Sequence, residues 1–289
     1  MVRRQPARLA ELVAFARDAS PYYRELYRHL PPRVDDLALL PVTTKKTLMA
    51  RFDDWVTDGA VTGEQARAFV DDPDRIGQRL RGRYLVVTSS GVTGHRGIFL
   101  IDDRADAVGT ALSVRMMGDW LTAADLARIV ARGGRMALVI ATGGHFAGFV
   151  GATRMRGAGG LRSRLARVFP VRMPLLELVA GLNRFRPAIL AGYASTLGLL
   201  AGEQAAGRLQ IHPVLVQPTS EGLPPGGETR MAKAFRAKVR AAYNASECLT
   251  IATAAGSGGS TSTATGWCSN RSTPTTGRCR PANSRTRSC

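Results

Sequence analysis

The chain has 289 residues, of which 45% are hydrophobic, and a formal net charge of +18. This length suffices for one large domain or two small ones around a buried core. No run of residues approaches the roughly eighteen apolar positions of a membrane span, and the N-terminus lacks a signal-peptide core. A membrane span is therefore not indicated, and a cytoplasmic location is expected by default.

The basic excess is concentrated partly at the C-terminal end. Residues 255–289 carry five arginines and no acid, which leaves +13 on residues 1–254. In residues 1–254 the positive charge is spread through Ala- and Arg-rich helical sequence. A GC-rich gene, which favours arginine and alanine codons, explains this excess more simply than a nucleic-acid-binding groove does. Nucleic acid is therefore a disfavoured partner.

Hydrophobic periodicity predicts two regions in series. Residues 1–80 read as mostly helical, with helices over 6–17, 21–27, 45–52 and 62–70. Beyond residue 80, strands are predicted over 84–88, 98–101, 136–141, 188–190 and 214–217, and helices over 102–121, 175–185, 196–205 and 228–239. Alternating strands and helices indicate a layered α/β fold with a largely parallel sheet. The predicted organisation is a helical N-terminal region (1–80), an α/β region (81–254) and a tail (255–289).

The tail has an unusual composition. Residues 255–289 contain no Leu, Ile, Val, Phe, Met, Asp, Glu or Lys, so they cannot form a core. Three of the four cysteines lie there, without CxxC pairs or nearby histidines, so a zinc site is not expected. When residues 266–284 are back-translated with mostly G/C-ending codons and read in another frame, they give a strand-like sequence that contains aliphatic and acidic residues and a turn. A shifted reading frame is the favoured interpretation, and a disordered Ser/Thr-rich tail is the alternative.

A loop of small and hydroxylated residues follows the predicted strand at 84–88. It reads Ser89-Ser90-Gly91-Val92-Thr93-Gly94-His95-Arg96-Gly97. Such a loop lets consecutive backbone N–H groups and hydroxyls approach a phosphate, although it has no Walker Gly-Lys-Ser/Thr. Taken alone, it is more often a plain turn.

Two further segments carry candidate chemistry. In Tyr243-Asn244-Ala245-Ser246-Glu247, the tyrosine can stack on adenine and the glutamate can hold Mg²⁺ on phosphate oxygens. The segment 187–195, which ends in Gly192-Tyr193-Ala194-Ser195, joins a strand to a helix. Each segment alone is equally compatible with an ordinary turn.

In this order, the three segments resemble the adenylate-forming superfamily, and within it the phenylacetate-CoA ligase and coenzyme F390 synthetase-like branch. The loop at 89–94 is similar to the family's phosphate loop, 243–247 to its Tyr-Gly-x-Thr-Glu motif, and 187–195 to its Gly-Tyr-Pro-Ser segment. Residues 20–23 and 40–45 resemble the N-terminal part of that branch, and 219–222 occupies the position of a Gly-Gly-Glu turn. The resemblance covers about residues 15–254 and implies the layered N-terminal domain of an adenylate-forming enzyme.

The resemblance implies that ATP and a carboxylate, an aryl or acyl acid, form an acyl-adenylate and that the acyl group passes to coenzyme A. Residues implied to hold the β- and γ-phosphates are Ser89, Ser90, Gly91, Thr93 and Gly94. Tyr243 would pack on adenine, Ser246 would touch phosphate, and Glu247 would act catalytically by positioning Mg²⁺.

The sequence departs from the family at several of these positions. Val92 replaces a hydroxyl residue, and His95-Arg96 replaces a basic-proline pair, although Arg96 can still meet phosphate electrostatically. Asn244 replaces glycine and tolerates a positive φ. The family's ribose-binding aspartate, hinge and C-terminal catalytic lysine do not occur in the printed chain, so little or no ligase activity is expected from it.

His145 follows a predicted strand in a glycine-rich segment. Such a residue at the carboxyl end of a strand favours a site in an open α/β sheet, and the resemblance implies an acyl-pocket or gating position. A loop histidine without a role is an equal alternative. For the whole chain, the alternatives are adenylylation of a deazaflavin hydroxyl by an F390 synthetase-like enzyme and a non-catalytic nucleotide- or nucleic-acid-binding remnant.

Overall fold

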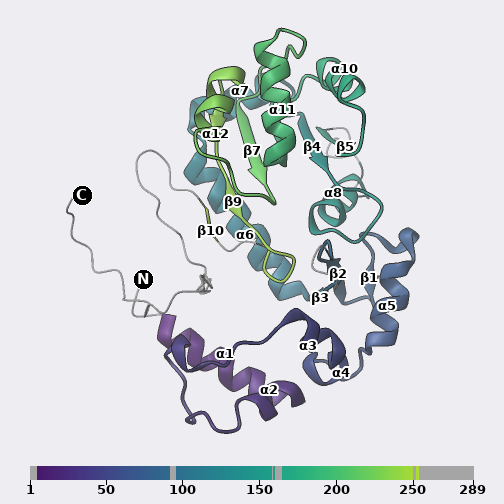
Figure 1. Ribbon diagram of the computed structural model, residues 1–289, viewed down its shortest axis with the longest axis vertical. Coiled ribbons are helices and arrows are strands. Elements are labelled where there is room, and N and C mark those ends of the chain that lie inside the picture. Colours follow the sequence, from purple (N-terminus) through teal and green to yellow (C-terminus); the bar gives the residue numbers. More distant parts are fainter. Residues whose placement is uncertain (1–4, 92–95, 158, 160–164, 250–251, 254–289) are drawn as a thin grey trace, which may run out of the picture.

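The computed structural model describes residues 5–91, 96–157, 159, 165–249 and 252–253 (Figure 1). Its helices are α1 (Gln5–Ala19), α2 (Pro21–Leu26), α3 (Lys45–Ala50), α4 (Phe52–Trp55), α5 (Gly63–Asp71), α6 (Asp103–Trp120), α7 (Ala123–Ala131), α8 (Ala147–Gly157), α10 (Leu175–Phe185), α11 (Ala194–Ala205) and α12 (Gly227–Phe235). The strands are β1 (Arg79–Leu80), β2 (Tyr84–Thr88), β3 (Ile98–Ile101), β4 (Met136–Ile140), β5 (Ala166–Pro170), β6 (Ile189–Tyr193), β7 (Leu215–Thr219), β8 (Lys238–Val239), β9 (Ala242–Tyr243) and β10 (Ala252–Thr253).

The N-terminal helices begin at side-chain caps that the sequence supplies. Ser20, Thr44 and Thr62 each accept a hydrogen bond from a backbone N–H in the first turn of α2, α3 and α5. The Ser20 hydroxyl is also within 3.0 Å of the carbonyl oxygens of Asp54 and Trp55, which ties α2 to α4. The Ile98 N–H donates to Met49 Sδ at 3.2 Å, which places α3 beside the sheet that follows.

A small antiparallel sheet, in the order β1-β2-β3, lies between the N-terminal helices and the rest of the chain (Figure 1). Phe52 of α4 and Phe69 of α5 share a buried cluster with Val86 and Ile98 of this sheet. Val150 of α8 joins a second cluster that contains Leu85 and Val87. Alternation along β2 therefore buries both faces of the strand. The boundary near residue 80 stays a prediction, and the first cluster crosses it.

The main sheet is parallel, with strand order β5-β4-β6-β7-β8. Helices α10, α11 and α12 cover one face through a core that includes Leu182, Leu197 and Phe235. Helices α6 and α7 cover the other face through Trp120 and Ile129. The predicted layered α/β fold with a parallel sheet is confirmed. The chain runs from β4 outward to β5 and then back to β6, so the strand order reverses beside β4.

Some predicted elements differ from the structure. The predicted helix at 228–239 is wrong over its last residues, because α12 ends at Phe235 and Arg236 adopts φ of 50°, after which the chain enters β8. Strand β5 and helices α7 and α8 were not predicted. None of the helices in the described part of the chain is long and apolar enough to cross a membrane. The predicted tail, residues 255–289, lies outside the described residues.

Candidate functional site

The phosphate-loop candidate begins where the two sheets meet. Thr88, the last residue of β2, donates its N–H to the carbonyl oxygen of His145 at 2.7 Å and pairs with Phe146 in a parallel bridge. Both of those residues follow the carboxyl end of β4. In open α/β sheets, ligands bind beside the carboxyl ends of strands where the strand order reverses. The loop at 89–97 therefore starts at the edge where such a fold binds its ligands.

Ser89 closes this loop from both sides. Its N–H donates to the Gly97 carbonyl oxygen at 3.0 Å, and its hydroxyl accepts from the Gly97 N–H at 2.8 Å. Gly91 has φ of +73°, a conformation that glycine adopts without strain. Ser90 is exposed. The described part of the loop is thus a narrow turn held at its base, with a hydroxyl at its rim.

Lys45, at the start of α3, lies against the same turn. Its Nζ donates to the Ser89 hydroxyl at 3.3 Å. A Cβ atom on Gly97 would lie 2.8 Å from the Lys45 Cδ and 2.7 Å from Phe99 Cε2, so glycine leaves room for the lysine stem. No carboxylate pairs with Lys45 among the residues that the structure describes. The ammonium group is therefore a cation without an acidic partner beside the loop.

The segment at 243–249 docks on the base of the loop. The Ser246 hydroxyl donates to the Thr88 carbonyl oxygen at 3.1 Å, and Leu249 packs against the core cluster of the small sheet. Tyr243, in β9, is 56% exposed, and Glu247 is exposed. The fold thus brings the first two predicted motifs together, with an aromatic face and a carboxylate left free.

The other three predicted phosphate contacts are Thr93, Gly94 and Arg96. Thr93 and Gly94 lie outside the described residues. Arg96 lies at the C-terminal end of the loop, and its Nη1 is 3.6 Å from Oδ1 of Asp71, which is itself largely exposed. A phosphate contact by Arg96 requires this exposed ion pair to open, at a small cost in free energy.

His145 contributes its backbone to the loop, but its ring lies in the protein interior. The side chain is only 1% exposed, its ring centroid is 5.4 Å from that of Phe69, and its Nε2 is 3.4 Å from the Asp72 carbonyl oxygen. Burial lowers the pKa of His145, and Arg96 lowers it further, whereas the Asp72 and Val86 carbonyls oppose the shift. In this conformation, the ring is shielded from solvent, and its buried Nδ1 has no hydrogen-bond partner among the described residues.

The lowered pKa of His145 predicts a loss of stability in mild acid. In the unfolded chain the imidazole of His145 is protonated below pH ~6.5, whereas in the folded chain it stays neutral to a lower pH. The free energy of unfolding therefore falls as the pH drops below about 6.5. His145→Phe keeps the ring packing and is expected to flatten this decline in urea unfolding measured across that range. The exposed His29→Phe is the matched control. Equal slopes for both variants would contradict the assignment.

The third predicted motif lies at the carboxyl end of β6. Gly192 is in β6, and Ser195 is in the first turn of α11, where its N–H donates to Oε2 of Glu221 at 2.8 Å. Glu221 comes from the segment that follows β7, so the structure joins this motif to the predicted Gly-Gly-Glu-like turn. A carboxylate at a helix N-terminus is favourable by itself. This contact supports a structural interpretation of the third motif.

Solved structures share this architecture. Three structures of 2-hydroxyisobutyryl-CoA ligase match 88% of this chain. The open form in complex with 2-HIB-AMP and CoA has a TM-score of 0.58 and 19% identity over 52% of its length. The postadenylation state with 2-HIB-AMP and the thioesterification state with 2-HIB-AMP and CoA each have a TM-score of 0.57 and 20% identity, over 50% and 51% of their length.

The chain shares the fold of these CoA ligases. It spans about half of their length. No family model matches the sequence, and no curated protein matches it. The likeness therefore establishes the fold, while the chemistry depends on the site itself.

Proposed function

We propose that this chain provides the ATP-binding half-site of an adenylate-forming ligase, which activates a carboxylate as acyl-adenylate for transfer to coenzyme A. The observation that carries the proposal is the meeting of Lys45, the Ser89 turn and Ser246 at the carboxyl edge of the sheet. The shared fold with ligases solved in complex with 2-HIB-AMP and CoA supports it.

The described donors fit a polyphosphate. The exposed hydroxyl of Ser90 offers a hydrogen bond, and Lys45 offers a positive charge. Tyr243 is free to cover adenine. Glu247 could hold Mg²⁺ together with phosphate oxygens, since this ion commonly uses one or two carboxylates and keeps several waters. The bound ion would neutralise phosphate charge.

In the proposed reaction, a substrate carboxylate oxygen attacks the α-phosphorus of ATP, and the bond to pyrophosphate breaks. The thiol sulfur of coenzyme A then attacks the acyl carbon, its proton is lost, and AMP leaves. The residues described here act by positioning the phosphates and balancing the charge that passes to pyrophosphate. His145 is proposed as a positioning residue, because its carbonyl holds Thr88 at the base of the loop.

A pyrophosphate-exchange assay tests this function. Labelled pyrophosphate is expected to enter ATP only when a suitable carboxylate is added, because the first step is reversible. A panel of aryl and acyl acids tests the phenylacetate-like assignment, and a deazaflavin tests the F390 synthetase-like alternative. Because little or no ligase activity is expected from this chain, only weak exchange is expected. Exchange that does not depend on an added acid or deazaflavin, or failure of the chain to bind Mg·ATP, would contradict the proposed reaction.

Replacing Lys45 tests the phosphate site separately. Lys45→Met keeps the apolar stem beside Gly97 but removes the charge, so the affinity for Mg·ATP is expected to fall about tenfold or more, as for loss of a charged hydrogen bond. Isothermal titration with Mg·ATP measures this change. Lys46→Met is the matched control, since Lys46 is exposed and, among the described residues, forms no hydrogen bond or ion pair with the loop. Equal affinities for the two variants would contradict the role of Lys45.

A further inference from the structure

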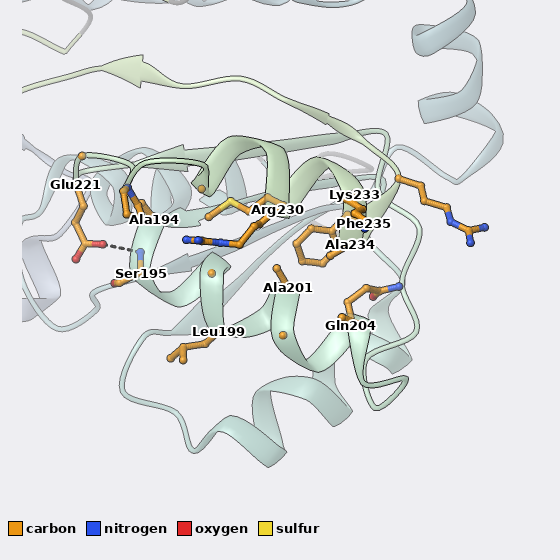
Figure 2. Close-up of a pocket in the computed structure, with 18 of the residues that line it drawn as sticks. Ala194, Ser195, Leu199, Ala201, Gln204, Glu221, Arg230, Lys233, Ala234 and Phe235 are labelled. Carbon is orange, nitrogen blue, oxygen red and sulfur yellow. Dashed lines mark hydrogen bonds between the residues drawn. The ribbon is translucent and has the colours of Figure 1, made fainter.

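A groove between α11 and α12 lies apart from the residues of the proposed ATP site. Its volume is about 1130 Å³, slightly above the roughly 300–1,000 Å³ that is usual for small-molecule clefts. Buried Ala201, Met231 and Phe235 contribute to its lining, and Leu199, 61% exposed, also lines it (Figure 2). The groove therefore offers an apolar surface to a ligand.

Space in the groove is open along α11. A Cβ atom added to Gly202 would meet no heavy atom within 4 Å, and that residue has an ordinary helical backbone without a positive φ. Ser195 lies on the same face of the helix, two turns nearer its N-terminus and about 10 Å along the axis at the rise of an α-helix. This length accommodates an acyl chain of medium length.

The charges of the lining favour an anion. Arg230 reaches across the groove toward the first turn of α11, and Lys233, Arg236 and His212 also line it (Figure 2). Within the described residues, Arg230 has no ion pair or side-chain hydrogen bond. The one acid in the lining, Glu221, already accepts the Ser195 N–H. An arginine at the side of an apolar slot matches a carboxylate with an apolar tail.

We propose that this groove is a binding site for an aliphatic monocarboxylate, separate from the ATP site. The carboxylate pairs with Arg230, and the chain lies along α11 past Gly202 over Met231 and Phe235. The burial of apolar tail surface contributes affinity, and Arg230 provides selectivity for the charged end. The site does not depend on the proposed ligase function.

Titration of the full chain with octanoate tests the site, with octanol and octylamine as probes of the same length. Octanoate is expected to bind, and both analogues are expected to bind at least about tenfold more weakly. Gly202→Leu fills the open space and is expected to abolish binding. Arg230→Gln is expected to weaken octanoate about tenfold while leaving octanol unchanged. Arg230 is exposed, so that variant is not expected to affect folding.

Several outcomes would overturn the proposal. These are no binding of octanoate to the unaltered chain, equal binding of octanoate and octylamine, or unchanged binding in both groove variants. Lys45→Met distinguishes this site from the ATP site, because it is expected to weaken Mg·ATP and leave octanoate binding intact. Loss of octanoate binding in Lys45→Met would show that the two sites are one, which contradicts the proposal.

Discussion

Replacing Gly192 by alanine is expected to lower the free energy of unfolding by about 1–3 kcal/mol, and replacing it by valine is expected to lower it further. Gly192 is in β6, between β4 and β7. A Cβ atom there would lie 2.7 Å from the Val139 carbonyl oxygen and 3.0 Å from the Val139 Cβ. The obstacle is backbone in the middle of the sheet, so it cannot rotate away as a flexible side chain would.

Urea unfolding of Gly192→Ala measures this loss. Gly118→Ala is the matched control, because Gly118 is in α6 with no heavy atom within 4 Å of an added Cβ. The control is expected to be neutral or to stabilise the chain by about 0.5–1 kcal/mol, since alanine favours a helix over glycine. If Gly192→Ala has the same free energy of unfolding as Gly118→Ala, the close approach of β4 to β6 at this position is refuted.

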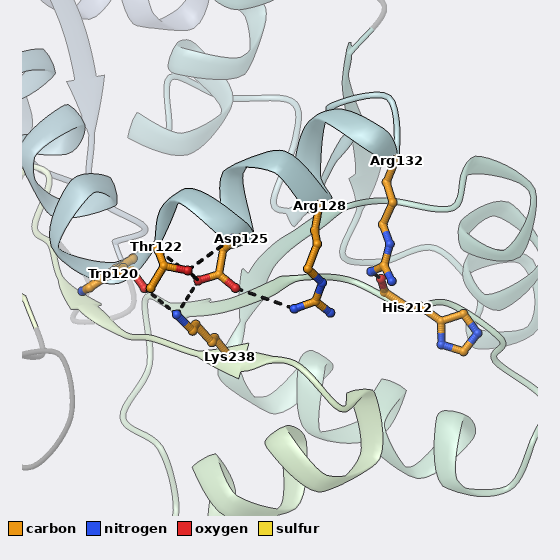
Figure 3. A network of polar contacts seen from close by, with 7 residues as sticks. All are labelled: Trp120, Thr122, Asp125, Arg128, Arg132, His212 and Lys238. Atoms are coloured by element: carbon orange, nitrogen blue, oxygen red, sulfur yellow. Dashed lines mark hydrogen bonds and ion pairs between the residues drawn. The ribbon is translucent and has the colours of Figure 1, made fainter.

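Replacing Asp125 by alanine is expected to cost about 3 kcal/mol of stability. Asp125 is 5% exposed near the N-terminus of α7, where its carboxylate accepts hydrogen bonds from the Thr122 N–H and hydroxyl and from Lys238 Nζ (Figure 3). Lys238 comes from β8, so this contact joins α7 to the last strand of the parallel sheet. The variant leaves the Lys238 ammonium without its carboxylate and removes the Asp125 side-chain half of the capping box of α7, whose N-cap is Thr122.

The same pair predicts acid sensitivity. Lys238, followed by Thr122, holds the pKa of Asp125 well below its usual range. The unfolded carboxyl takes up a proton near pH ~4, so the contribution of Asp125 is present above that pH and is lost as the pH falls toward the folded value. Urea unfolding of Asp125→Ala is expected to show a smaller decline below about pH 4 than the unaltered chain.

A double variant separates the ion pair from packing. Asp125→Leu with Lys238→Met removes both charges, and it is expected to be more stable than Asp125→Ala, because no charge is left without a partner. If Asp125→Ala unfolds at the same urea concentration as the unaltered chain, the pair contributes nothing measurable.

Local sequence predicted the elements that have a clear period. The β-branched runs of β2 and β3 gave bounds that match the structure, as did the amphipathic helix α10. Strand β5 was missed because Arg167 and Pro170 interrupt its apolar pattern, and α8 was missed because glycines weaken the helical signal. Helix α12 ends where Arg236 adopts a left-handed backbone conformation. Residues other than glycine rarely adopt this conformation, so the sequence did not indicate the end of the helix.

The site was predictable only in part for a similar reason. The Ser89 loop and the Tyr243–Glu247 segment carry recognisable residue types, and the fold brings them together through Ser246. Lys45 is 44 residues away from Ser89 along the chain, so no local pattern could place it beside the loop. The glycine at 97 is the one local sign of that contact, since a side chain there would displace the lysine stem.

The most direct test of the ATP site is hydrogen–deuterium exchange of the full chain with and without Mg·ATP. Peptides that cover residues 88–97 and 243–249 are expected to exchange more slowly with Mg·ATP, and less protection is expected with AMP, because AMP lacks the β- and γ-phosphates. Lys45→Met is expected to reduce the protection of 88–97. Unchanged exchange in both segments at saturating Mg·ATP, or protection confined to α11 and α12, would contradict the assignment of this loop as the ATP site.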